Sequence, residues 1–264
     1  MTTVIVHHGT PSSARLWEPW VEDAKRRGID LVGFQRPGYG GTLRAEGRDI
    51  AWVAEAVARF ADERGIGEFA TWGISGGGPH ALACAALLPD RVTTAACIGT
   101  PAPYGAEGLD WYAGQGEGNI VEFETSLQGE ELLRALLERE AAAMLSGQES
   151  GFDTLFSPPD QAILPQLQGF LGQTFSEAMS GGVDGWLDDD LAFVRDWGFE
   201  LADIRVPVLL VHGAQDRFVP AAHGRWLAQR IPGVETRILD DEGHLSLYAR
   251  IPDVHEWLLD RSTG

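Results

Sequence analysis

Lysine and cysteine are scarce in this sequence. Lys25 is the only lysine among 20 basic residues, so chemistry that needs a lysine late in the chain is excluded. The two cysteines, Cys84 and Cys97, are too few for a disulfide framework and lack the spacing of metal ligands. Both lie in apolar stretches, so we expect buried thiols and a cytoplasmic protein.

Long apolar runs and excess positive charge are also missing. No stretch of about 18 apolar residues occurs, and the first residues, MTTVIVHHG, lack the basic and apolar regions of a signal peptide. Acidic residues outnumber basic ones by 39 to 20, which gives a net charge of -19. Such a surface repels nucleic acid and anionic membranes, so we expect a small-molecule substrate and neither of those partners.

What the sequence does contain is a series of short apolar runs bounded by turn residues. Most include β-branched residues without strict alternation, the pattern of strands that are buried on both faces of a parallel sheet. Helical patterns fall between the runs. This alternation predicts an α/β fold with a mostly parallel sheet of about six strands flanked by helices. The six runs are residues 4–7, 30–34, 69–72, 94–98, 208–212 and 236–239.

The alternation of strands and helices stops after the fourth run. The segment LLRALLEREAAAML has the apolar spacing of an amphipathic helix, and two more helices are expected over 160–178 and 186–197. We therefore predict an α/β core formed by residues 1–104 and 201–264. Residues 105–200 are expected to be inserted as a helical cap over one end of the sheet.

A glycine-rich turn follows the third run. Gly73-Ile74-Ser75-Gly76-Gly77 matches the pattern G-x-S-x-G and lies between a predicted strand and a predicted helix. This is the context of a nucleophile elbow, in which small neighbours permit a tight turn that exposes the serine hydroxyl. The helix that begins there points free N–H groups and its positive dipole end at a developing oxyanion. We therefore predict Ser75 as a nucleophile.

A serine nucleophile needs a base, and the base needs an orienting acid. His244 lies in DDEGHLSLY, between the last strand and the last helix, and is the predicted base. Asp216, in HGAQD, follows the fifth run on the same edge of the sheet and is the predicted acid, with Asp110 as an alternative. The oxyanion hole is expected from the backbone N–H groups of Thr10 and Gly76.

These motifs, in the order HGTP, GFQRPGYGG, GISGG, HGAQD and EGH, resemble the α/β-hydrolase superfamily over nearly the whole chain. The resemblance implies Ser75 as nucleophile, Asp216 as acid and His244 as base, with Thr10 and Gly76 as the oxyanion hole. Members usually begin with an antiparallel strand pair before the HG strand. That hairpin is expected to be absent here, because the HG strand starts at the fourth residue. One sheet edge is then expected to be uncovered or used in a dimer.

Individual residues disfavour several reactions of this superfamily. Haloalkane dehalogenases and epoxide hydrolases of this fold use an aspartate where Ser75 stands. Plant-type hydroxynitrile lyases need a late lysine, and prolyl aminopeptidases typically carry tryptophan where Gly76 stands. What remains is hydrolysis of a small or medium carboxylic ester or lactone through an acyl-enzyme, as in serine carboxylesterases and lactonases.

Three alternatives stay open: hydrolysis of an activated carbon–carbon bond, a non-hydrolytic biosynthetic enzyme, and a ligand receptor on the same fold. No metal or organic cofactor is expected, because the sequence shows no cluster of ligands.

Aromatic residues of the predicted cap and of the segment after the oxyanion loop are candidates for an apolar substrate pocket. We expect the pocket to be lined by Trp17, Trp111, Tyr112, Phe175 and Trp186.

Acidic and imidazole side chains elsewhere are interpreted as structural or exposed. Glu117, Glu122 and Glu124 could recognise an amine, but surface charge is the favoured interpretation. His223 and His255 are expected on the surfaces of helices.

Overall fold

Six parallel strands form the centre of the molecule, which the computed structural model describes over residues 2–148 and 150–262. Each strand coincides with one of the six apolar runs, extended by up to two residues at an end. The prediction of a six-stranded α/β sheet is therefore confirmed. The strands are β1 Thr2–His7, β2 Ile29–Phe34, β3 Phe69–Ile74, β4 Val92–Ile98, β5 Val208–Gly213 and β6 Glu235–Leu239.

The order of the strands across the sheet is β2-β1-β3-β4-β5-β6. Every strand pair in the described part of the chain is parallel, so the sheet shows the expected lack of an antiparallel hairpin. Because all strands run the same way, the loops that follow β1, β3, β5 and β6 emerge at one edge of the sheet. The motifs HGTP, GISGG, HGAQD and EGH all lie at or just after the carboxyl ends of these strands.

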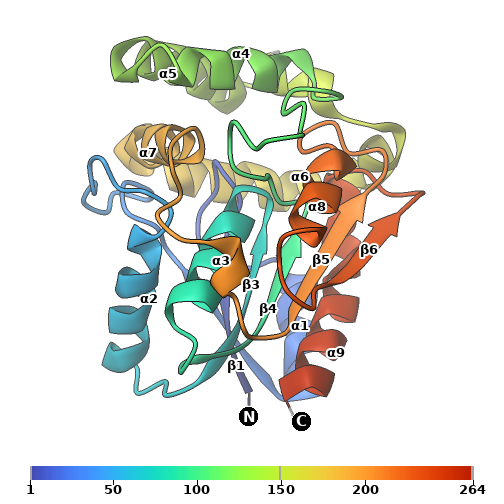
Figure 1. Cartoon of the computed structure of the whole chain (residues 1–264). Coiled ribbons are helices and arrows are strands. Elements are labelled where there is room, and N and C mark those ends of the chain that lie inside the picture. Colours follow the sequence, from blue (N-terminus) through green and yellow to red (C-terminus); the bar gives the residue numbers. More distant parts are fainter. Residues whose placement is uncertain (1, 149, 263–264) are drawn as a thin grey trace.

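Helices cover both faces of the sheet (Figure 1). Apolar residues of α2, α3 and α8 pack with Phe69 and Leu210 in one core cluster. Residues of α1 and α9 pack with Trp72 and Leu209 in a second cluster. Neighbouring residues of one strand therefore face opposite layers, which explains the continuous apolar runs. These helices are α1 Glu18–Arg27, α2 Trp52–Glu63, α3 Gly78–Leu87, α8 Ala221–Ala228 and α9 Ile251–Ser262.

Four further helices lie between β4 and β5 in the chain and over the carboxyl ends of the strands. Figure 1 shows α4 and α5 farthest from the chain termini, with α6 and α7 closer to the sheet. Leu133, Leu137 and Trp186 form a third buried cluster with Tyr39, which follows β2. The helices are α4 Glu117–Ser126, α5 Glu130–Ser146, α6 Pro158–Ala178 and α7 Asp184–Phe193.

Helix α4 is absent from the sequence-based prediction. Its stretch EGNIVEFETS has no clear apolar stripe, and only Asn119, Glu122 and Ser126 in it are buried. Among the described helices, none combines the length and the apolar character needed to cross a membrane.

Helix α5 allows a test of the third cluster with two leucines on one helix. Leu137 is fully buried, whereas Leu132 is half exposed. We expect Leu137→Ala to lower the free energy of unfolding by about 2–5 kcal/mol, because it removes a buried side chain and leaves a cavity. Leu132→Ala should stay within about 0.5 kcal/mol of the wild type. Urea denaturation measures both, and equal losses would contradict this packing.

Candidate active site

Ser75 occupies a strained turn between β3 and α3. Its φ is 53°, which makes it the one non-glycine residue with positive φ in the described ranges. A Cβ atom at Gly73 would lie 2.2 Å from the carbonyl oxygen of Gly77, and one at Gly77 would lie 2.1 Å from that of His7. Both glycines are needed because the turn folds back on itself and against the end of β1. Such strain is typical of residues held for function.

His244 and Asp216 meet at the same edge of the sheet, from the loops after β6 and β5. His244 Nδ1 lies 2.6 Å from Asp216 Oδ2, and both side chains are buried. Asp216 Oδ1 accepts hydrogen bonds of 2.8 Å from the backbone N–H groups of Phe218 and Val219. An Nδ1–H that donates to Asp216 leaves Nε2 of His244 as an acceptor. Asp110, the alternative acid, is exposed and is not paired with His244.

The surroundings of His244 set its charge and position. Burial alone would lower the pKa of the imidazole, but the neighbouring Asp216 carboxylate outweighs burial and raises it. The ring stacks on Phe218, with 4.7 Å between the ring centroids. At Gly99, where φ is +54°, a Cβ atom would lie 3.0 Å from His244 Nδ1. Gly99 therefore supplies the space at the end of β4 that the imidazole occupies.

Asp160, at the start of α6, also fixes the loop that carries His244, a role that the sequence analysis did not predict. Its Oδ1 accepts hydrogen bonds from the backbone N–H groups of Leu245 (2.7 Å) and Ser246 (3.1 Å). Its Oδ2 accepts from the backbone and hydroxyl of Ser157, the N-cap of α6. The pattern S-x-x-D indicates a local capping box only, because the contacts to residues 245 and 246 span 85 and 86 positions.

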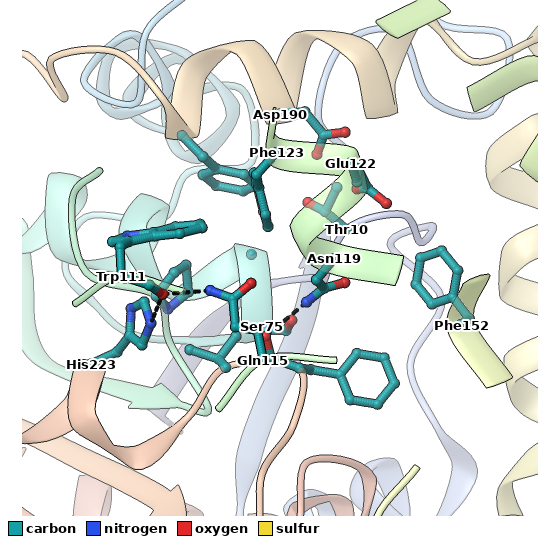
Figure 2. Close-up of a pocket in the computed structure, with 15 residues that line it drawn as sticks. Thr10, Ser75, Trp111, Gln115, Asn119, Glu122, Phe123, Phe152, Asp190 and His223 are labelled. Atoms are coloured by element: carbon teal, nitrogen blue, oxygen red, sulfur yellow. Dashed lines mark hydrogen bonds between the residues drawn. The ribbon is translucent and has the colours of Figure 1, made fainter. Parts of the chain in front are cut away.

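Thr10 and Gly76, whose backbone N–H groups are the predicted oxyanion donors, lie next to each other. A Cβ atom at Gly76 would lie only 2.5 Å from Thr10 Oγ1, and both residues line a small cavity with Ser75 (Figure 2). The Thr10 hydroxyl donates a 2.6 Å hydrogen bond to Asp189 Oδ2. Arg36 donates to the same carboxylate and to the carbonyl oxygens of His8 and Gly9. The loop after β1 is therefore held by hydrogen bonds to Asp189 and to Arg36.

Asp189 on α7 is fully buried and is the centre of this network. Besides Thr10 and Arg36, it accepts hydrogen bonds from Arg48 Nη2 and from the Tyr39 hydroxyl. Burial alone would raise the pKa of this carboxyl, but Arg36 and Arg48 outweigh burial and hold the pKa well below its usual range. Asp189 is therefore a carboxylate with two buried cationic partners.

A larger cavity of about 300 Å³ is lined by Ser75, Thr10 and His244. Its walls are mainly apolar, with residues of α5, the following loop and α6 such as Met144, Phe156, Leu164, Leu171 and Phe175. Of the five predicted pocket residues, Phe175 lines this cavity and Trp111 lines the small one (Figure 2).

The other three predicted pocket residues lie outside both linings. Trp17 packs against Trp20, Phe170 and Tyr248 on the α1 side of the sheet. Tyr112 packs against Trp111 and Tyr104. Trp186 is fully buried in the third cluster, and its indole Nε1–H donates to Glu122. Their aromatic rings stabilise packing between segments.

The interpretation of three polar side chains as exposed is wrong. His223 is buried; its Nδ1 accepts from the Ala102 N–H and its Nε2 lies 3.0 Å from the Trp111 carbonyl oxygen. His255 is buried beside Asp23, with 2.9 Å between Nδ1 and Oδ2. Glu122 is 8% exposed and lines the small cavity, whereas Glu117 and Glu124 are exposed. The described residues contain no group of three or more side chains suited to a metal ion.

A family model described as alpha/beta hydrolase fold matches residues 2–250. Two relatives are pimeloyl-[acyl-carrier protein] methyl ester esterases. The enzyme of Aromatoleum aromaticum is 47% identical over 49 residues, 19% of this chain and 20% of that protein. That of Nitrosomonas europaea is 25% identical over 245 residues, 91% of this chain and 88% of that protein.

A third relative is the dihydrolipoyllysine-residue acetyltransferase component of an acetoin cleaving system from Cupriavidus necator. It is 28% identical over 229 residues, which cover 86% of this chain and 55% of that protein. The chain thus spans about a fifth of the Aromatoleum protein and about half of the Cupriavidus protein.

Solved structures share the architecture at low sequence identity. A bromoperoxidase from Bacillus anthracis superposes with a TM-score of 0.77 at 19% identity, covering 100% of this chain and 92% of that chain. An enol-lactonase from Burkholderia xenovorans LB400 has a TM-score of 0.72 at 20% identity, with the same coverage. These similarities concern the fold alone.

The Asp189 network predicts a large effect of one buried charge. Asp189→Asn leaves two buried guanidinium groups without a carboxylate, so we expect a loss of about 3–5 kcal/mol in the free energy of unfolding at neutral pH. Because the folded pKa is depressed, the contribution of Asp189 is fully present above the unfolded pKa of about 3.9, declines below it, and is lost as the pH falls through the lower folded pKa.

A matched control lies on the same helix. Asp184 pairs with Arg134 at 2.7 Å in a partly exposed site, so Asp184→Asn should stay within about 1 kcal/mol of the wild type. Chemical denaturation at neutral pH compares the two variants. If Asp189→Asn lowers the free energy of unfolding no more than Asp184→Asn does, the predicted effect of the buried charge is contradicted.

Proposed function

The chain belongs to the alpha/beta hydrolase fold family, and from that membership we propose that it cleaves a small or medium carboxylic ester or lactone through an acyl-enzyme intermediate. The observation that carries the proposal is one shared cavity. It is lined by Ser75 in its strained turn and by His244, whose imidazole is paired with the buried Asp216. The methyl ester esterases among the relatives support the same chemistry.

In this proposal the reaction begins with Ser75. His244 Nε2 takes the proton from Ser75 Oγ as the oxygen attacks the substrate carbonyl. Asp216 holds the imidazole in the tautomer that leaves Nε2 free, and its negative charge stabilises the imidazolium that forms. His244 then returns the proton to the leaving alcohol, and a water molecule activated by His244 cleaves the acyl-enzyme.

The negative charge of the tetrahedral intermediate needs donors that are already in place. We assign them to the backbone N–H groups of Thr10 and Gly76, which line the cavity with Ser75. The hydrogen bond from the Thr10 hydroxyl to Asp189 supports this assignment, because it fixes the loop before any substrate binds.

Residues 105–200 act in this proposal as a cap that excludes water from the site. Side chains of α5, α6 and the loop between them form most of the apolar wall of the larger cavity. A volume of about 300 Å³ is at the low end for small-molecule sites, which favours short acyl groups over long lipids.

The first test is hydrolysis of p-nitrophenyl acetate, butyrate and octanoate by the wild type and by Ser75→Ala. We expect turnover of acetate and butyrate, slower turnover of octanoate, and a loss of about 10⁴–10⁶ in kcat in Ser75→Ala. Ser180→Ala changes an exposed serine and should keep full activity. Equal rates in the wild type and Ser75→Ala, or no turnover of any ester, would refute the proposal.

The second test is the pH dependence of kcat/KM for p-nitrophenyl acetate. His244 must be neutral to act as a base and Asp216 raises its pKa, so the rate should fall with decreasing pH around a midpoint above about 6.5. In Asp216→Asn, burial acts without the carboxylate, so the midpoint should move to lower pH. The maximal rate should also drop by about 10⁴-fold, the loss seen when a serine protease triad is changed in this way. Asp253→Asn removes an exposed charge and should leave the midpoint in place.

A further inference from the structure

Two carboxyl groups meet in the small cavity beside Ser75. Asp190 on α7 and Glu122 on α4 lie next to each other at one end of this cavity, near Thr10 (Figure 2). Asp190 is 1% exposed, and no N–H group of the described residues donates to its carboxyl oxygens; its carboxyl group interacts with that of Glu122. Glu122 accepts a hydrogen bond of 2.9 Å from Trp186 Nε1. Burying a carboxyl group without a hydrogen-bond donor costs free energy, and a bound ligand that supplies donors would offset this cost.

The protein supplies no cation to this pair. The described residues that line the cavity include no lysine or arginine. His223, the one imidazole in the lining, is neutral because burial lowers its pKa to about 4, and both of its ring nitrogens are in contact with backbone groups. Arg36 and Arg48 donate to Asp189, the residue before Asp190 on α7. No described side chain of the lining therefore supplies a positive charge to balance the pair.

The polar lining also has an excess of acceptors. Gln115 Nε2 donates a 2.7 Å hydrogen bond to the Trp111 carbonyl oxygen, which fixes the amide orientation and leaves Oε1 without a partner (Figure 2). Among the fully buried side-chain atoms of the lining, three oxygens have no N–H donor in the described residues, two from Asp190 and one from Gln115. A ligand that fits this lining donates hydrogen bonds. The aromatic side chains of Trp111 and Phe123 line the same space.

We propose that this cavity recognises a primary ammonium group of the substrate, held by Asp190 and Glu122. The site rests on the proposed function in one respect, because it places the charged end of an ester or lactone substrate beside Ser75. The volume of about 40 Å³ accepts a group of ammonium size and excludes a bulky one.

The protonation of the pair agrees with this assignment. Burial raises the pKa of Glu122 to about 7, and burial together with the nearby Glu122 raises the pKa of Asp190. Without a cation the two carboxyl groups can pair only by holding a proton between them. An ammonium group replaces that proton and offers three N–H donors, whereas a hydroxyl offers one.

Binding can be measured without catalysis. We would titrate n-butylammonium chloride and butan-1-ol into the Ser75→Ala protein by calorimetry, at about pH 8, where an alkylammonium remains charged. The ammonium should bind about tenfold or more tightly than the alcohol, as expected for one charge-assisted hydrogen bond against a neutral one. Asp190→Asn, made in the same background, should abolish that preference.

The chain offers a matched control on α4. Glu124→Gln removes the same charge as Glu122→Gln, two residues away, from an exposed position. Glu122→Gln should weaken ammonium binding by about tenfold, and Glu124→Gln should leave it within about twofold. Circular dichroism confirms folding, and Glu122→Gln carries the test should Asp190→Asn fail to fold. Equal binding of ammonium and alcohol, or equal effects of the two glutamate variants, would overturn the proposal.

A second readout connects the site to the substrate. We would compare the p-nitrophenyl esters of 3-aminopropanoate to 6-aminohexanoate with the alkanoate esters in which a methyl group replaces the ammonium. At one chain length kcat/KM should favour the ammonium ester by about tenfold in the wild type, and Glu122→Gln should remove the preference. Turnover of the alkanoate esters with no ammonium preference at any length would overturn this inference and leave the hydrolase proposal intact. Ammonium binding seen by calorimetry without turnover of any ester would support the ammonium site and overturn the hydrolase proposal.

Discussion

A buried carboxylate with two guanidinium partners is the constraint on which the rest of the site depends. Asp189 accepts hydrogen bonds from Thr10, Arg36, Tyr39 and Arg48, which come from the loops after β1 and β2. Removing one partner of such a cluster leaves an uncompensated charge in a dry interior, so the members are held together as a unit. The same contact fixes Thr10 beside Ser75 and orients α7, and the orientation of α7 determines where Asp190 points.

Close backbone approach is the second constraint at the carboxyl edge of the sheet. The turn at Ser75 folds against His7, the imidazole of His244 fills the space above Gly99, and the loop at Gly243 packs on Asp160. At each of these places a Cβ atom would meet its neighbour at 3.0 Å or less. The glycines therefore determine how near the three side chains of the proposed triad can come to one another.

The sequence predicted the parts of the molecule that depend on short-range patterns. The six strands followed from apolar runs, and the pairing of His244 with Asp216 followed from motif order along parallel strands that end at one edge. Helix α4 and the burial of Glu122 on it were not predicted. The sequence of α4 has no apolar stripe, and the buried residues of this helix are polar. The roles of Asp160 and Asp189 were also missed, since their partners lie 85 and up to 179 positions away and only the folded chain brings them together.

The start of α6 is bonded directly to the loop that carries His244. Asp160 accepts hydrogen bonds from the backbone N–H groups of Leu245 and Ser246. At the other end of the helix, Thr174 and Glu177 form hydrogen bonds with Ser13 of the loop that follows β1. Displacing α6 would break these hydrogen bonds and disturb both ends of the proposed catalytic machinery. A substrate route that swings α6 outward therefore works against catalysis. The hydrogen bonds at both ends of α6 hold the helix in place. An opening through which substrate enters the cavity is therefore expected between other segments.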